Sequence, residues 1–467
     1  MLCLFSLTAG TRIRWQTIYE CFKMSQAETL TLSSCNLVGY FPLCYSNFKA
    51  GWSHFLSCGY SEPAAENAIE NWQGDYASVE LNEFPITEAS VEQRVRYEMS
   101  TPGCGNEQDR LYLAHINTPN VARDLNLVRN LTGYTEMDWW GCGYGAVLAV
   151  TYAAMFPQNV GRMVLDGMSL KATLTKAPRN FPEYMRMATN ALDYSFDSRA
   201  QIPQILYEFA GYCVEAAEIS LDLCPLAAKS MGSKANARTS GLALRINEMV
   251  ANLSRVSGFV DPDNSSHVLT FHELVTEIAQ YLNTPKGFVT LAQTLLDAER
   301  IISNGKIHSQ SHQRRDWLNS TYTSLTRTTL AHDDPFSVLA LSCLDSNLTG
   351  KDTAETFSAY LHSLLDKDPL LAYGGFDYAA CLSWPNLTNF DVERWRSPFS
   401  NVTHKLLLIP GTNDPSCSYA SGLSTYNYVG SDNANVLVHD SVGHCSFNNP
   451  NTCTTNAIRN YFVSGTS

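Results

Sequence analysis

The sequence has no apolar run approaching the roughly 18 residues that a membrane-spanning helix needs, so we expect no membrane segment. Positive charge is scarce, because 32 Lys and Arg face 45 Asp and Glu and the net charge is -13 at pH 7. The longest basic cluster is the pair Arg314-Arg315, so a nucleic-acid surface is not expected either. No two cysteines have the CxxC spacing of a structural zinc site, and we expect neither a metal nor a cofactor.

A strand-to-helix turn is predicted around the glycine-rich segment WWGCGYGA, residues 139–146. An apolar strand over 137–140 precedes the turn, and small residues follow at helical spacing up to Pro157. The alternating glycines match a GxSxG nucleophile elbow, whose central residue carries the nucleophile on a strained turn. Here the central position is Gly143, so the nucleophile is missing. Taken alone, such a segment is also typical of a phosphate-binding or purely structural turn.

Two apolar runs near the C-terminus each lead into a residue with triad chemistry. The run over 405–410 leads into Asp414, and the run over 435–438 leads into His444. Elbow, acid and histidine is the chain order of α/β-hydrolase triads. His444 is therefore predicted to be the general base, and Asp414 the residue that orients it. The alternatives are an ordinary loop histidine and an Asp-Pro turn with a capping role.

Short motifs follow one another along the chain at residues 117–118, 122–125, 144–145, 152–157, 160–167, 343–345, 381–385, 414–415, 443–446 and 453–465. Their ordered combination resembles the secreted tripeptidyl-aminopeptidase-like and prolyl-aminopeptidase-like serine peptidases of the α/β-hydrolase superfamily, with their TAP-like C-terminal region. The resemblance extends over roughly residues 110–467, apart from a divergent middle. It implies a mostly parallel sheet flanked by helices, with a large helical lid inserted.

Two departures limit what this resemblance implies. The family's serine falls on Gly143, which has no side chain to attack a carbonyl. The family also carries a glycine-rich oxyanion loop after an early strand, but the only adjacent glycines here are Gly374-Gly375, far downstream. The stretch 37–42, with Cys44 after it, looks like a remnant of the segment beyond that loop, so we expect the N-terminal strands to be partly missing.

Four further residues near the predicted site have two interpretations each. The backbone N–H of Tyr144 would supply half of an oxyanion hole, while its ring is expected to pack. Asp166 and Asp345 could bind the N-terminal amine of a peptide, or could form structural salt bridges or caps. Cys142 could replace the lost nucleophile, but a residue that ends the strand should turn its side chain away from the face that Gly143 presents.

The chain length allows one large domain with an insertion, or two domains. We assign residues 1–168 to the first half of the hydrolase core, with 1–110 divergent or truncated, and residues 396–467 to its TAP-like second half. Between them, residues 169–395 are predicted to form the helical lid. A face with helical spacing predicts core packing of this lid, and could also line a pocket; it comprises Phe271, Leu274, Val275, Ile278, Leu282, Leu291, Leu295 and Ile302.

Fourteen cysteines are many for a reduced cytosolic protein, although scattered core thiols are the simpler interpretation. Local spacing favours disulfides between Cys213 and Cys224 and between Cys445 and Cys453. The resemblance adds the pair Cys343 with Cys381, and Cys44 with Cys104 is a weaker fourth.

Seven glycosylation sequons also favour secretion, although chance alone would give several. The first ten residues contain a short apolar stretch but no basic n-region, so a signal peptide is not clearly present. We therefore predict an extracellular protein. We also expect it to be a monomer. The sequon asparagines are Asn130, Asn252, Asn264, Asn319, Asn347, Asn386 and Asn401.

Three functions fit the sequence. The chain could be an impaired or engineered inactive member of a secreted serine exopeptidase lineage that releases N-terminal residues or short peptides. It could be a pseudoenzyme that binds a peptide or small apolar ligand without turnover. It could also run acid-base chemistry through His444 in a lyase or isomerase step. Loss of both the nucleophile and the oxyanion loop favours the pseudoenzyme over a single engineered change.

Overall fold

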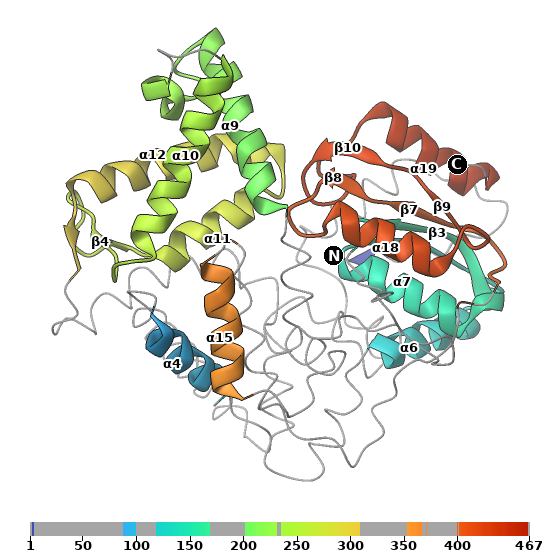
Figure 1. Cartoon of the computed structure of the whole chain (residues 1–467). Coiled ribbons are helices and arrows are strands. Elements are labelled where there is room, and N and C mark those ends of the chain that lie inside the picture. The colour runs from blue at the N-terminus through green and yellow to red at the C-terminus, as the bar shows by residue number, and fades with distance from the viewer. Residues whose placement is uncertain are drawn as a thin grey trace.

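The computed structural model describes residues 2–3, 87–99, 118–168, 201–230, 235–308, 353–366, 370, 399 and 401–465. These residues form a parallel sheet covered by helices and a helical lobe beside it (Figure 1). The segments expected to contain early strands fall mostly outside these ranges, so the loss of those strands stays a prediction.

The main sheet has five strands in the order β1-β2-β3-β7-β9. β2, β3, β7 and β9 pair in parallel, while the edge strand β1 runs antiparallel to β2. The prediction that the apolar runs share one parallel sheet is confirmed, and with it the α/β fold class. The strands are β1 (Leu2–Cys3), β2 (Met137–Cys142), β3 (Val160–Asp166), β7 (Leu406–Ile409) and β9 (Ala434–Val436).

Helices cover both faces of this sheet, which explains why its strands consist of continuous apolar residues. Because side chains alternate along a strand, Leu406 and Leu408 pack toward one layer and Leu407 and Ile409 toward the other. The first layer contains α7 (Tyr144–Met155), α6 (Thr118–Leu131) packed on it, and α18 (Tyr419–Val429). The second contains α19 (Thr452–Ser464), whose Tyr461 is 2% exposed.

Two short strands extend the core beyond the predicted runs. β8 (Gly411–Asn413) and β10 (His439–Val442) pair in parallel and form a small sheet of their own. β8 ends immediately before Asp414, and β10 ends one residue before Gly443 and two before His444. These strands carry the predicted acid and base to the same edge of the fold.

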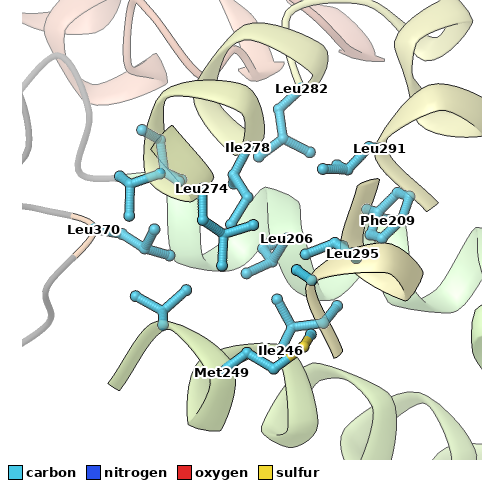
Figure 2. Packing of buried hydrophobic residues seen from close by; sticks show 14 of the residues in the cluster. Leu206, Phe209, Ile246, Met249, Leu274, Ile278, Leu282, Leu291, Leu295 and Leu370 are labelled. Atoms are coloured by element: carbon cyan, nitrogen blue, oxygen red, sulfur yellow. The ribbon is translucent and has the colours of Figure 1, made fainter. Parts of the chain in front are cut away.

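The helical lobe is built on four long helices around their own apolar core (Figure 2). The predicted apolar face lies in this core, since Leu274, Ile278 and Leu282 are all 0% exposed and Ile302 packs at its margin. Each such fully buried side chain contributes roughly 1.5–3 kcal/mol. The helices are α9 (Ile202–Ile219), α10 (Ala235–Leu253), α11 (Phe271–Tyr281) and α12 (Phe288–Asn304).

The ends of the lobe helices follow local sequence signals. The Thr270 hydroxyl caps α11 by accepting the N–H of Glu273 (3.2 Å). Pro285 begins the short 3-10 turn η4 (Pro285–Gly287) that separates α11 from α12, and Pro225 begins η3 (Pro225–Ser230). A small antiparallel sheet, which the sequence does not predict, closes one end of the lobe: β4 (Phe259–Val260), β5 (Val268–Leu269) and β6 (Lys306–Ile307).

One helix departs from the expected domain division. α4 (Glu88–Met99), which falls within the predicted first half of the core, packs against α15 (Ala354–Leu365) in the lobe (Figure 1). Its Val91 and Val95 are buried in the lobe's apolar cluster because they lie four residues apart on one face. No helix in the described ranges is both long enough and apolar enough to span a bilayer.

Candidate active site

The turn between β2 and α7 has the backbone of a nucleophile elbow. Gly143 separates the two elements, with φ 55° and ψ -117°. Its N–H lies 3.1 Å from the carbonyl oxygens of both Asp166 and Gly167, which ties the turn to the end of β3. A Cβ at Gly141 would lie 2.2 Å from the Gly145 carbonyl oxygen, so only glycine lets strand and helix approach this closely.

The position that would carry a nucleophile faces His444. An ideal Cβ built on Gly143 would lie 3.1 Å from His444 Nε2 and 3.4 Å from its Cε1. A hydroxyl on that Cβ would be within hydrogen-bonding reach of Nε2, the arrangement that activates a serine. Because residue 143 is glycine, this position presents only backbone to the imidazole.

Asp414 and His444 form the acid-base pair that the sequence predicts. His444 Nδ1 lies 3.0 Å from both carboxylate oxygens of Asp414, which is itself 0% exposed. The backbone N–H groups of Ser416 and Cys417 donate to Asp414 Oδ1 (2.8 Å each) and that of Cys445 donates to Oδ2 (3.2 Å). Three donors hold the carboxylate in place, so the imidazole has a fixed orientation with Nε2 toward Gly143.

Neighbouring charges raise the pKa of the His444 imidazole. Burial disfavours the imidazolium, but the adjacent Asp414 carboxylate outweighs burial and, with Asp166 nearby, raises the pKa of His444 above its ordinary value. The pair can therefore accept and hold a proton, as a general base must.

Asp166 anchors the loop that carries His444. Its carboxylate accepts the backbone N–H of Ser446 (2.9 Å) and the Ser446 hydroxyl (2.6 Å), and the Trp140 indole N–H lies 3.4 Å away. Burial, opposed by these donors, raises the pKa of Asp166 to about 6. The residue is 1% exposed, so it cannot reach a ligand amine, and the substrate-binding interpretation is wrong for this side chain. Asp345 lies outside the described residues.

One predicted disulfide is wrong and another is present. Cys445 is bonded to Cys142 at the end of β2, not to Cys453, which is exposed and free near the start of α19. Cys445 has φ 64°, and this left-handed backbone accompanies a side chain directed toward β2. Cys213 and Cys224 are bonded as expected. The other predicted cysteines, Cys44, Cys104, Cys343 and Cys381, lie outside the described residues.

The prediction that the Cys142 side chain turns away from the site is wrong. Its Sγ lies 3.6 Å from His444 Nε2, so the side chain faces the site instead of turning away from it. As half of a disulfide it has no thiolate, however, and cannot act as the nucleophile in this form.

The predicted oxyanion-hole donor lies at the start of α7. This donor is the backbone N–H of Tyr144, the residue directly after Gly143. The phenol of Tyr144 pairs with the Thr118 hydroxyl (2.9 Å). The helix N-terminus favours developing negative charge there.

Two lobe residues that sequence reasoning missed join the site to the lobe. The Asn283 carbonyl accepts the His444 N–H, and its side-chain oxygen accepts the Ser416 hydroxyl (2.8 Å each). Gln201 donates to the Thr412 carbonyl and accepts the Tyr419 N–H (2.8 Å each). Both lie next to helix ends, where polar residues are common, so neither forms a recognisable motif.

Four of the sequon asparagines lie in the described residues, and all are exposed, as glycosylation requires. These are Asn130, Asn252, Asn264 and Asn401. Asn319, Asn347 and Asn386 lie outside the described ranges. Glycosylation itself stays a prediction.

Comparisons with known proteins match two parts of this chain. A family model described as alpha/beta hydrolase fold matches residues 58–218, and one described as TAP-like protein matches residues 373–467. The chain is 31% identical to a tripeptidyl aminopeptidase of Streptomyces lividans over 87 residues, 18% of this chain and 16% of that protein. It is 39% identical to serine protease Hip1 of Mycobacterium tuberculosis over 64 residues, 14% of this chain and 12% of that protein.

The aligned stretches thus cover less than a fifth of either relative. The two family models, by contrast, contain all three site positions, Gly143 in the first and Asp414 and His444 in the second. The chain has the α/β-hydrolase fold, and its residues 373–467 match a TAP-like protein.

Proposed function

We propose that this chain is a non-hydrolysing member of a serine exopeptidase lineage, which binds the N-terminal part of peptides without cleaving them. The observation that carries the proposal is Gly143 at the elbow centre. Acyl transfer requires a side-chain nucleophile at the position that faces His444, and a glycine supplies none.

Support for a binding role comes from the parts of the site that remain. The elbow backbone, the Asp414–His444 pair and the N-terminus of α7 retain the geometry of a hydrolase site. A site of this kind without its nucleophile retains the binding contributions and part of the charge stabilisation. The intact pair also supports a second candidate, in which His444 transfers a proton in a lyase or isomerase step.

An extracellular location is part of the proposal. Two disulfides lie in the described residues, and oxidising compartments are where such bonds persist. The four exposed sequons fit the same environment. Secretion would be tested by expressing the full-length gene with its native start in a eukaryotic host and comparing medium with cell lysate.

The catalytic part of the proposal is tested on the unmodified chain. A fluorophosphonate probe should leave it unlabelled, and aminomethylcoumarin peptides with free N-termini should show no turnover above buffer. Binding is tested separately by calorimetry with tripeptides against their N-acetylated forms, and the free-amine peptides should bind more tightly. Turnover of the peptides would refute the inactive assignment, and equal or absent binding of the two peptide forms would refute the peptide-binding role.

A further inference from the structure

Three metal-ligating side chains converge where the nucleophile would stand. The Sγ atoms of Cys142 and Cys445 and the Nε2 of His444 all lie within 4.8 Å of one another. Nε2 is 3.6 Å from the first sulfur and 3.5 Å from the second. In a tetrahedral zinc site, with Zn–S about 2.3 Å and Zn–N about 2.0–2.1 Å, ligand sulfur and nitrogen atoms stand roughly 3.5 Å apart. The sulfur-to-nitrogen spacing therefore already fits zinc.

The imidazole also has the orientation of a metal ligand. Metal-bound histidines usually donate the other ring N–H to a carboxylate, which fixes the tautomer. His444 Nδ1 meets Asp414 at 3.0 Å, so its Nε2 is the nitrogen left for a metal. Asp414 is in turn held by the N–H groups of Ser416 and Cys417. The hydrogen bonds that would support a zinc-bound imidazole are thus already formed.

Gly143 completes the arrangement. A metal about 2 Å from Nε2 would occupy the region where a Cβ on residue 143 would stand, 3.1 Å from that nitrogen. Any larger residue would crowd the metal or its fourth ligand. Glycine at position 143 therefore leaves room for a metal beside the imidazole.

We propose that the reduced chain binds zinc through Cys142, His444 and Cys445, with water as the fourth ligand on the Gly143 side, and that the Cys142–Cys445 disulfide closes this site. An external dithiol would supply the two electrons: the protein S–S bond breaks, the dithiol becomes a disulfide, and Zn²⁺ displaces the two thiol protons. This inference goes beyond the proposed peptide binding and does not depend on it.

A competing ligand set is less suitable. Asp414, Cys417 and His444 also place three donor atoms within 4.8 Å. In this set the imidazole nitrogen near the carboxylate is already engaged by it.

Cobalt(II) tests the site on the full chain after reduction with a phosphine. We expect one equivalent of tetrahedral cobalt with a thiolate-to-metal charge-transfer band, displaced by zinc and absent from the oxidised protein. The double variant Cys142→Ser/Cys445→Ser should lose the band. The matched control Cys213→Ser/Cys224→Ser removes the same number of thiols and should keep it. His444→Ala should weaken cobalt binding at least about tenfold.

Site-resolved alkylation gives a second measurement that does not rely on spectra. Zinc should slow the reaction of iodoacetamide with Cys142 and Cys445 in the reduced chain, but not with the exposed Cys453. A reduced chain that takes up no cobalt, whether folded or not, overturns the proposal. A band that survives in the Cys142→Ser/Cys445→Ser variant, or one that disappears with Cys417→Ser, also overturns it.

Discussion

Replacing Gly143 by serine tests both the strain of the elbow and the readiness of the remaining pair. At φ 55° and ψ -117° a residue with a Cβ is strained, and such conformations cost roughly 1–3 kcal/mol. The new Cβ would also lie 3.1 Å from His444 Nε2, so the ring must give way by a few tenths of an ångström. We therefore expect Gly143→Ser to lower the free energy of unfolding by about 1–3 kcal/mol while the site gains a nucleophile.

The assay is fluorophosphonate labelling followed by gel fluorescence, with denaturant unfolding of each variant. Gly143→Ala is the matched control, because it introduces the same Cβ and the same strain without a hydroxyl. Gly143→Ser should be labelled, Gly143→Ala should not, and adding His444→Ala should abolish the labelling. A folded Gly143→Ser protein without label would refute the inferred alignment of elbow and base. An alanine variant as stable as the parent would refute the strain argument.

Three further predictions concern stability and charge. Glu277 lies in α11, and burial raises its pKa from 4.5 to about 7. The folded chain therefore binds an extra proton between these two pH values, and stability falls as the pH rises through that range. Solvent screening of the partly exposed carboxyl limits this fall to about 1–2 kcal/mol, and Glu277→Gln should remove it in urea titrations at pH 5 and pH 8. Asn283→Ala removes the acceptor of the Ser416 hydroxyl and should cost about 1 kcal/mol in the same titrations, with Asn283→Asp as the variant that keeps an acceptor. Ser446→Ala removes a donor from the Asp166 carboxylate and should raise its pKa further above about 6, as carboxyl carbon NMR would show; an unchanged pKa would contradict the anchoring role.

The main sheet could be predicted because its strands are buried on both faces. Four consecutive apolar residues, Leu406 to Ile409, followed by Pro410, are typical of a doubly covered strand. The short strands β8 and β10 could not be predicted in the same way, since their residues, GTN and HDSV, are mostly polar. They are strands because they pair with each other in parallel, which is a tertiary property.

The two disulfides in the described residues show a second limit of prediction from sequence. Cys213 and Cys224 are 11 residues apart, and a local spacing of this kind can be recognised in a sequence. Cys142 and Cys445 are 303 residues apart and become neighbours only when β2 and the loop after β10 reach the same edge. The predicted partner of Cys445 is wrong because nearness in sequence does not imply nearness in space. The metal-ligand set escapes sequence reasoning for the same reason, since its members come from distant parts of the chain.

The contacts that hold this site together do not involve a side chain at position 143. The Asp166 carboxylate holds the His444 loop through Ser446, and Asn283 holds the same loop from the lobe. The N–H of Gly143 is tied to the carbonyls that end β3, whichever residue stands at its side-chain position. Glycine in place of a serine would therefore remove the chemistry without removing the contacts that keep base and elbow face to face. This independence is why a chain with glycine at the elbow can keep a triad-like pair, and why restoring one hydroxyl is expected to be enough to recover labelling.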